Sequence, residues 1–175
     1  MEVTLKIRRS NSSTNGKGVD QDYTLEVEDG ATILDALVQI REDQDPTLAF
    51  RGSCRTGFCG DCTMNVNGKG AICCRITVDQ ASKKAEDGTI TVAPLKLINI
   101  AKDLIYDADN FHWDKFKAVE PWIEPGEPPA EGEYIVDNKS IEELRVAMSC
   151  TQCGLCDQGC VVIDVDRTYL GPAAL

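Results

Sequence analysis

Cysteine thiols are the side chains of this sequence with the clearest capacity for chemistry. The chain holds nine cysteines, and an odd number cannot pair off completely as disulfides. They form one group at Cys54, Cys59, Cys62, Cys73 and Cys74 and a second group at Cys150, Cys153, Cys156 and Cys160. The N-terminal segment lacks the apolar block of a signal peptide, which predicts a reducing compartment where disulfides are rare. We therefore expect these thiols to bind metal.

The first group follows the pattern C-x4-C-x2-C, with Cys73 and Cys74 further along the chain. This spacing is the signature of a plant-type [2Fe–2S] site. Gly57 and Gly60 permit the backbone angles that turn N–H groups toward sulfur, and such contacts tune the reduction potential. A zinc site is the alternative, although zinc ligands usually come as separated C-x2-C pairs. If residues 71–78 form a strand, adjacent cysteines face opposite ways and one of the two can reach the cluster.

The second group follows C-x2-C-x2-C-x3-C, the run found in bacterial ferredoxins. Three thiols at this spacing can surround one [4Fe–4S] cluster, whereas the fourth ligates the other cluster in two-cluster ferredoxins. Val161 stands after the fourth cysteine, where Pro is usual. Zinc is again the alternative.

Charge and hydropathy exclude several classes of partner. The formal net charge of −11 argues against nucleic acid, because phosphate binding requires a basic face. It also argues against unaided binding to anionic lipid. No apolar run approaches the ~20 residues of a transmembrane helix. The expected partner is another protein.

The remaining candidates for chemistry are few. His112 is the single histidine, which excludes a Rieske centre because that centre requires two, and we expect it to be structural rather than a general base. Trp113 and Trp122 are expected to pack between domains or against a partner. No phosphate-binding fingerprint is present. The chain is therefore predicted to carry electrons while another chain performs the substrate chemistry.

The elements that must position the first thiols are predicted from periodicity. Alternation over 3–7 and 23–27 indicates a hairpin, and the apolar stripe of 32–41 indicates a helix. Further strands are expected at 63–66, 71–78 and 89–92. Two strands, a helix, a glycine-rich loop and more strands predict a β-grasp ferredoxin domain over 1–97.

The second half of the chain is predicted to be mainly helical, so the fold class is α+β. Residues 98–119 read as helical, and the Pro/Glu-rich stretch 120–133 reads as an extended connector. Ser140 and Glu143 have capping-box spacing and are expected to open a helix that ends near Ser149. The predicted divisions are 98–137, a helical segment with its connector, and 138–175, a partial bacterial-type [4Fe–4S] ferredoxin domain.

Both cysteine motifs, in this order, resemble the iron–sulfur subunit of succinate dehydrogenase and fumarate reductase. The stretches that carry the resemblance are 45–54, 59–68, 102–105 and 169–175. The resemblance implies that Cys54, Cys59, Cys62 and Cys74 hold a [2Fe–2S] cluster, that Cys150, Cys153 and Cys156 hold three corners of a [4Fe–4S] cluster, and that Cys160 serves a [3Fe–4S] or second cluster. It makes Cys73 a small buried core residue.

The same resemblance implies partners and a location. In that family an FAD-bearing flavoprotein subunit exchanges electrons, through the clusters, with quinone at a membrane anchor subunit. The expected location is peripheral, on the cytoplasmic face of a prokaryotic cell membrane or on the matrix side of the mitochondrial inner membrane.

Two departures from the family pattern leave alternatives open. The family's later cysteines, which complete the [4Fe–4S] and [3Fe–4S] sites, are absent, so we expect truncation or a separate C-terminal iron–sulfur fragment. Val161 and the missing tryptophans motivate an alternative to the quinone-linked complex, a related complex whose electron partner is a thiol or disulfide. A zinc-stabilised interaction module without a redox role is a third hypothesis.

Overall fold

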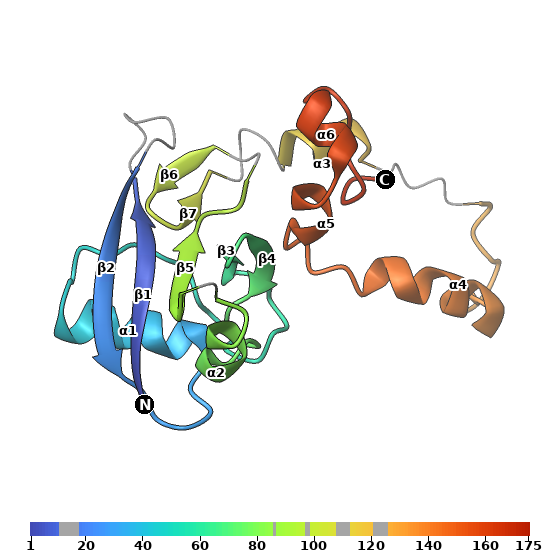
Figure 1. Ribbon diagram of the computed structural model, residues 1–175. Coiled ribbons are helices and arrows are strands. Elements are labelled where there is room, and N and C mark those ends of the chain that lie inside the picture. Colours follow the sequence, from blue (N-terminus) through green and yellow to red (C-terminus); the bar gives the residue numbers. More distant parts are fainter. Residues whose placement is uncertain (11–17, 86, 97–98, 108–112, 121–125) are drawn as a thin grey trace.

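The computed structural model describes residues 1–10, 18–85, 87–96, 99–107, 113–120 and 126–175 (Figure 1). A five-stranded sheet and one long helix make up the N-terminal part. The strands are β1 (Glu2–Arg9), β2 (Val19–Glu26), β3 (Thr63–Val66), β4 (Lys69–Ile72) and β5 (Thr89–Ala93), and their order in the sheet is β2-β1-β5-β3-β4. Strand β5 pairs parallel with β1, and the other pairs are antiparallel. The predicted β-grasp arrangement is confirmed.

Apolar periodicity explains why these segments form a layer of sheet under a helix. Alternate residues of β1, Leu5 and Ile7 among them, are buried on one face of the sheet. Helix α1 (Ile33–Asp43) lies across that face in Figure 1 and buries Leu34, Leu37 and Ile40. Thr32 caps the helix in a reciprocal box with Asp35. The predicted strands at 63–66 and 89–92 and the helix at 32–41 lie at these positions.

The predicted strand at 71–78 is wrong after its first two residues. Strand β4 ends at Ile72, and helix α2 (Val78–Ser82) begins soon afterwards. Thr77 caps that helix through a reciprocal box with Gln80, a local signal that competes with strand extension. Cys73 and Cys74 therefore lie in a turn rather than in a strand.

The prediction of a helical stretch over 98–119 is also largely wrong. Strands β6 (Ile100–Lys102) and β7 (Ile105–Tyr106) form a small hairpin, and within the described part of this stretch the helix is α3 (Asp114–Ala118). Residues 98 and 108–112 lie outside the described residues. Asp103, in the turn of this hairpin, has a left-handed backbone φ of 49° and is almost fully buried. Its carboxylate accepts hydrogen bonds from the backbone N–H groups of Ser10 and Ala49. These partners, distant in sequence, hold the segment as a hairpin.

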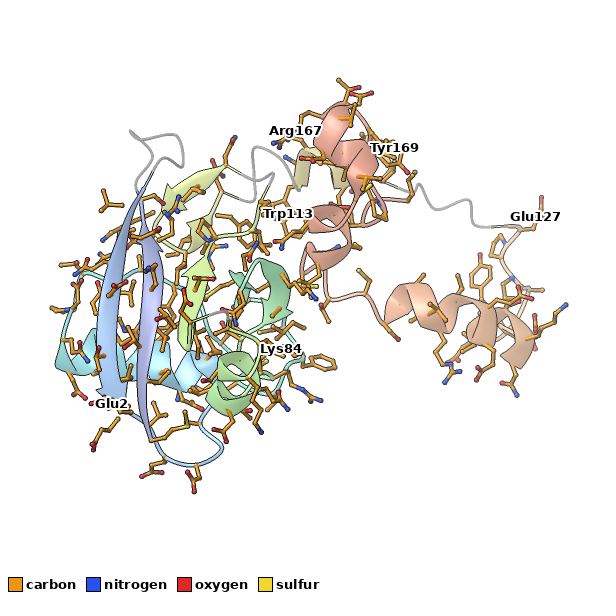
Figure 2. All side chains as sticks on the ribbon, viewed as in Figure 1. Glu2, Lys84, Trp113, Glu127, Arg167 and Tyr169 are labelled. Atoms are coloured by element: carbon orange, nitrogen blue, oxygen red, sulfur yellow. The ribbon has the colours of Figure 1, made fainter. Side chains whose placement is uncertain are left out.

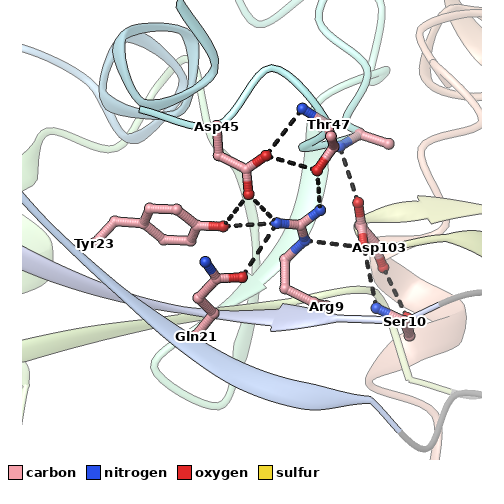
Figure 3. Close-up of polar contacts among 8 residues, drawn as sticks. Arg9, Ser10, Gln21, Tyr23, Asp45, Thr47 and Asp103 are labelled. Atoms are coloured by element: carbon pink, nitrogen blue, oxygen red, sulfur yellow. Dashed lines mark hydrogen bonds and ion pairs between the residues drawn. The ribbon is translucent and has the colours of Figure 1, made fainter. Parts of the chain in front are cut away.

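An ion-pair network fixes this hairpin to the sheet (Figure 3). The Arg9 guanidinium lies 3.1 Å from the Asp103 carboxylate and also contacts Asp45. The Tyr23 hydroxyl donates a 2.6 Å hydrogen bond to Asp45. Hydrogen bonds from Thr47 and Tyr23 hold the pKa of Asp45 well below its usual range.

The C-terminal part consists of helices with little shared core. Helix α4 (Asn138–Met148) buries none of its residues, and α5 (Leu155–Gln158) and α6 (Val161–Val165) follow it. The capping prediction was shifted, because Asp137 rather than Ser140 is the N-cap and α4 begins at Asn138. Residues 126–133 form no helix or strand. Figure 2 places Glu127 near helix α4, far from Trp113.

The last residues fold back toward α3. The Lys115 ammonium donates a hydrogen bond to the Tyr169 carbonyl, and the Ala173 N–H donates to the buried Asp157 carboxylate at 3.0 Å. Ile163 is fully buried beneath these contacts. Among the described residues, no helix has both the length and the apolar character needed to cross a bilayer.

Candidate iron–sulfur sites

The first thiol group is brought together by the loop before β3 and the turn after β4. Cys54 and Cys59 lie on the loop, Cys62 directly precedes β3, and Cys74 follows β4. Because β3 and β4 are antiparallel neighbours, the turn returns Cys74 to Cys62, and the Cys74 N–H lies 3.4 Å from the Cys62 sulfur. The pairing of β3 with β4 thus brings Cys62 and Cys74 together, although they are twelve residues apart in the sequence.

Backbone N–H groups of the loop turn toward sulfur. The N–H groups of Thr56, Phe58 and Cys59 donate to the Cys54 sulfur at 3.3–3.4 Å. Left-handed backbone angles at Gly57 (φ 79°) and Gly60 (φ 73°) shape this loop, as predicted from the glycines. The arrangement can stabilise negative charge on a cluster and its thiolates.

These surroundings shift the acidity of the thiols in opposite directions. Hydrogen bonds from Thr56 and from the Cys59 backbone lower the pKa of Cys54 to about 5, which favours the thiolate that binds metal. Burial raises the pKa of Cys62 to about 11. A thiol held this way binds metal by losing its proton to solvent as the metal arrives.

Cys73 and Cys74 differ in their surroundings. Cys73 is fully buried in the apolar core, and this burial holds its pKa far above the usual range. Cys74 retains 8% exposure, and its N–H donates to the Cys62 sulfur, whereas the Cys73 N–H donates to the Cys62 carbonyl. The expected burial of Cys73 is confirmed, although a turn rather than a strand separates the two side chains. The assignment of Cys74 as a ligand stays a prediction.

The second thiol group lies on a more open segment. Cys150 follows α4, Cys156 lies within α5, and Cys160 caps α6. Cys150 and Cys156 are exposed, whereas Cys153 and Cys160 are half-buried. The Gln152 N–H donates to the Cys150 sulfur at 3.4 Å. Burial and the nearby Asp157 raise the pKa of Cys156.

The donor chemistry fits iron–sulfur clusters. Within the described ranges, no three Cys, His, Asp or Glu side chains converge on one point as ligands of a single metal ion. A [2Fe–2S] cluster does not demand that convergence, because two irons share four thiolates. Four thiols from one loop and one turn, with N–H donors aimed at sulfur, provide what that cluster requires.

Sequence reasoning missed Tyr106 beside these sites. Its half-buried ring lies under the Arg51 guanidinium, 5.5 Å from the ring centre, and burial raises its pKa. No spacing in the sequence predicts this position, because it depends on the unexpected β6–β7 hairpin. His112 and Trp122 lie outside the described residues. Trp113 packs against Phe116, with ring centres 5.8 Å apart.

Comparison with known proteins decides the family. The model of the family described as "2Fe-2S iron-sulfur cluster binding domain" matches residues 4–113. The chain belongs to this family. The predicted [2Fe–2S] cofactor and the α+β fold class are therefore confirmed, whereas the individual ligands and the divisions at 97 and 137 stay predictions.

Curated relatives are similar to this chain along most of its length. The mitochondrial succinate dehydrogenase [ubiquinone] iron–sulfur subunit 1 of Oryza sativa subsp. japonica is 36% identical over 159 residues, 89% of this chain and 54% of that protein. The corresponding subunit of Dictyostelium discoideum is 35% identical, and the match covers 99% of this chain and 62% of that protein. The chain thus spans less than two thirds of these relatives.

A solved structure is also similar over nearly the whole chain. A chain of the Mycobacterium smegmatis Sdh1 complex in the apo form superposes with a TM-score of 0.85 at 28% identity. The match covers 98% of this chain and 70% of that one. The predicted resemblance to succinate dehydrogenase iron–sulfur subunits is confirmed.

Proposed function

We propose that this chain is the electron-transfer subunit of a succinate dehydrogenase or fumarate reductase. The observation that carries the proposal is the presence of two cysteine loops in contact within one chain. Gly60, between Cys59 and Cys62, packs directly against Cys153 of the second loop. The similarity to succinate dehydrogenase iron–sulfur subunits supports the same function.

The roles of the thiols follow from this proposal. Four thiolates of the first group hold the [2Fe–2S] cluster, and N–H groups aimed at sulfur stabilise its more negative, reduced state. Three thiolates of the second group hold a [4Fe–4S] cluster, and Cys160 serves a third centre of [3Fe–4S] type. When bound, the clusters accept and release single electrons. The proposed ligands of the first cluster are Cys54, Cys59, Cys62 and Cys74. Those of the second cluster are Cys150, Cys153 and Cys156, and Cys160 is the proposed ligand of the third centre.

The proposed partners supply what this chain lacks. An FAD-containing flavoprotein subunit dehydrogenates succinate, and a membrane anchor subunit binds quinone, a role that the word ubiquinone in the relatives' names supports. A further iron–sulfur segment supplies the remaining ligands of the second and third centres. The chain is held at the membrane through the anchor.

A related complex with a thiol or disulfide partner is the second candidate. Val161, which opens α6 in place of the usual Pro, is 77% exposed. An exposed Val in place of the usual Pro changes the surface next to Cys160. This change favours a different electron partner at that end of the chain. Both candidates use the same two cysteine loops.

The experiment is anaerobic purification of the native complex that contains this chain. We expect a large flavin-containing subunit to co-purify, iron and acid-labile sulfide to be present, and succinate to reduce a quinone analogue. Activity only with fumarate and a dithiol would replace the first candidate by the second. Zinc without iron or sulfide would overturn both in favour of an interaction module.

A further inference from the structure

The two cysteine loops approach each other at the buried Gly60. A Cβ added to Gly60 would lie 2.6 Å from the Cβ of Cys153 and 3.1 Å from its Cα. The hydroxyl oxygen of Thr151 would lie 3.2 Å away. Real Cβ atoms do not approach one another at 2.6 Å, so any side chain at this position would force the loops apart.

The backbone at Gly60 has little freedom to give way. Its carbonyl accepts hydrogen bonds from the N–H and the hydroxyl of Thr63, at 3.2 and 2.5 Å, and Thr63 is almost fully buried. Its φ of 73° is one that L side chains rarely adopt. The facing atoms are the Cα and Cβ of Cys153, which cannot rotate away because they belong to the backbone or are bonded directly to it. Relief must therefore come from displacement of the second loop.

A second contact between the loops is more tolerant. A Cβ at Gly70 of β4 would meet the ends of two side chains, Leu155 at 2.7 Å and Gln158 at 2.8 Å. Ends of flexible side chains can rotate away. Gly70 therefore lies in the same contact between the two cysteine regions, which we call the seam, but it does not set the distance between them.

We propose that Gly60 is the positioning residue that sets the distance between the two iron–sulfur loops. The inference rests on the proposed function, in which one electron leaves the [2Fe–2S] site and enters the site of Cys153. Two ligand-bearing loops in direct contact give that electron a short path. The absence of a side chain at Gly60 is what allows the contact.

The test is the variant Gly60→Ala in the native complex, studied by EPR of the fully reduced protein and by pulse radiolysis. We expect the [2Fe–2S] signal to persist, the magnetic interaction between the clusters to weaken, and transfer between them to slow several-fold. Gly68→Ala is the control for backbone strain, because Gly68 has φ 79° and no atom within 4 Å of an added Cβ. Gly70→Ala is the control for the seam. Both controls should match the unaltered complex.

Gly70→Phe provides a second route if Gly60→Ala fails to assemble its cluster. This larger side chain should push α5 away without touching the first loop's backbone, and it should also weaken the interaction. Unchanged interaction and rate in whichever of these variants assembles would overturn the inference alone. Lack of any second cluster in the unaltered complex would overturn the proposed function and the inference together.

Discussion

The two cysteine regions of this chain are built in contrasting ways. The first group is anchored to a packed core, with Cys62 and Cys74 buried and loop N–H groups donating to sulfur. In the second, Cys150 and Cys156 are exposed, and the preceding helix α4 buries none of its residues. Iron binding at the first site thus uses a scaffold already stabilised by apolar burial, whereas the second site has two exposed thiols and follows a helix with no buried residue.

Iron loading should show the largest effect of this difference. We expect the 175-residue chain, reconstituted with iron and sulfide under nitrogen, to retain about two irons on gel filtration. The reason is that the fourth ligand of the second cluster is predicted to come from outside these residues, while Cys160 serves another cluster. The second site should fill only after a C-terminal cysteine-bearing piece is added. About six irons retained by the chain alone would contradict this expectation.

Substitution at the adjacent cysteines should sharpen the description of the first region. Cys74→Ser is expected to abolish the [2Fe–2S] EPR signal of the reduced protein, because Cys74 is the predicted fourth ligand and lies in the turn beside Cys62. Cys73→Ser, the matched variant, should leave the cluster assembled, because the Cys73 thiol is enclosed by the core. The reverse pattern would show that the ligand is one residue earlier.

Truncation of one leucine in each region should separate their contributions to stability. Leu37→Ala creates a cavity under the sheet and should lower the free energy of unfolding by about 2–5 kcal/mol. Leu144→Ala, on the exposed helix α4, should change it by less than about 0.5 kcal/mol. Urea unfolding under nitrogen, followed by circular dichroism, measures both. Equal losses would mean that α4 shares the core of the first region.

Polar anchoring should separate the two regions by less than the leucine truncations do. Asp103→Asn weakens the contact with Arg9 and is expected to cost about 1–3 kcal/mol, because the site is buried. Asp137→Asn caps α4 equally well and should leave unfolding unchanged. The same urea experiment compares them. A stability change at Asp137 that matches the one at Asp103 would remove the distinction between the two regions.

Local signals in the sequence predicted much of the first region correctly. The cysteine spacing, the glycines of the loop, the stripe of α1 and the alternation of β1 and β2 all act within a few residues. Their physical basis is the fixed period of helices and strands and the freedom of glycine backbone. The [2Fe–2S] cofactor was predicted from the cysteine spacing and the glycines, and the family from the resemblance that both cysteine motifs carry.

Tertiary contacts decided the features that local signals could not. Asp103 holds its turn through Ser10, a partner 93 residues away, so the helical prediction for that segment failed. The pairing of β3 with β4 brings the Cys74 N–H to the Cys62 sulfur and the Cys73 N–H to the Cys62 carbonyl. The approach of Gly60 to Cys153 joins loops separated by a whole domain. Periodicity carries no information about such pairs, because their energies depend on packing and burial after the chain has folded.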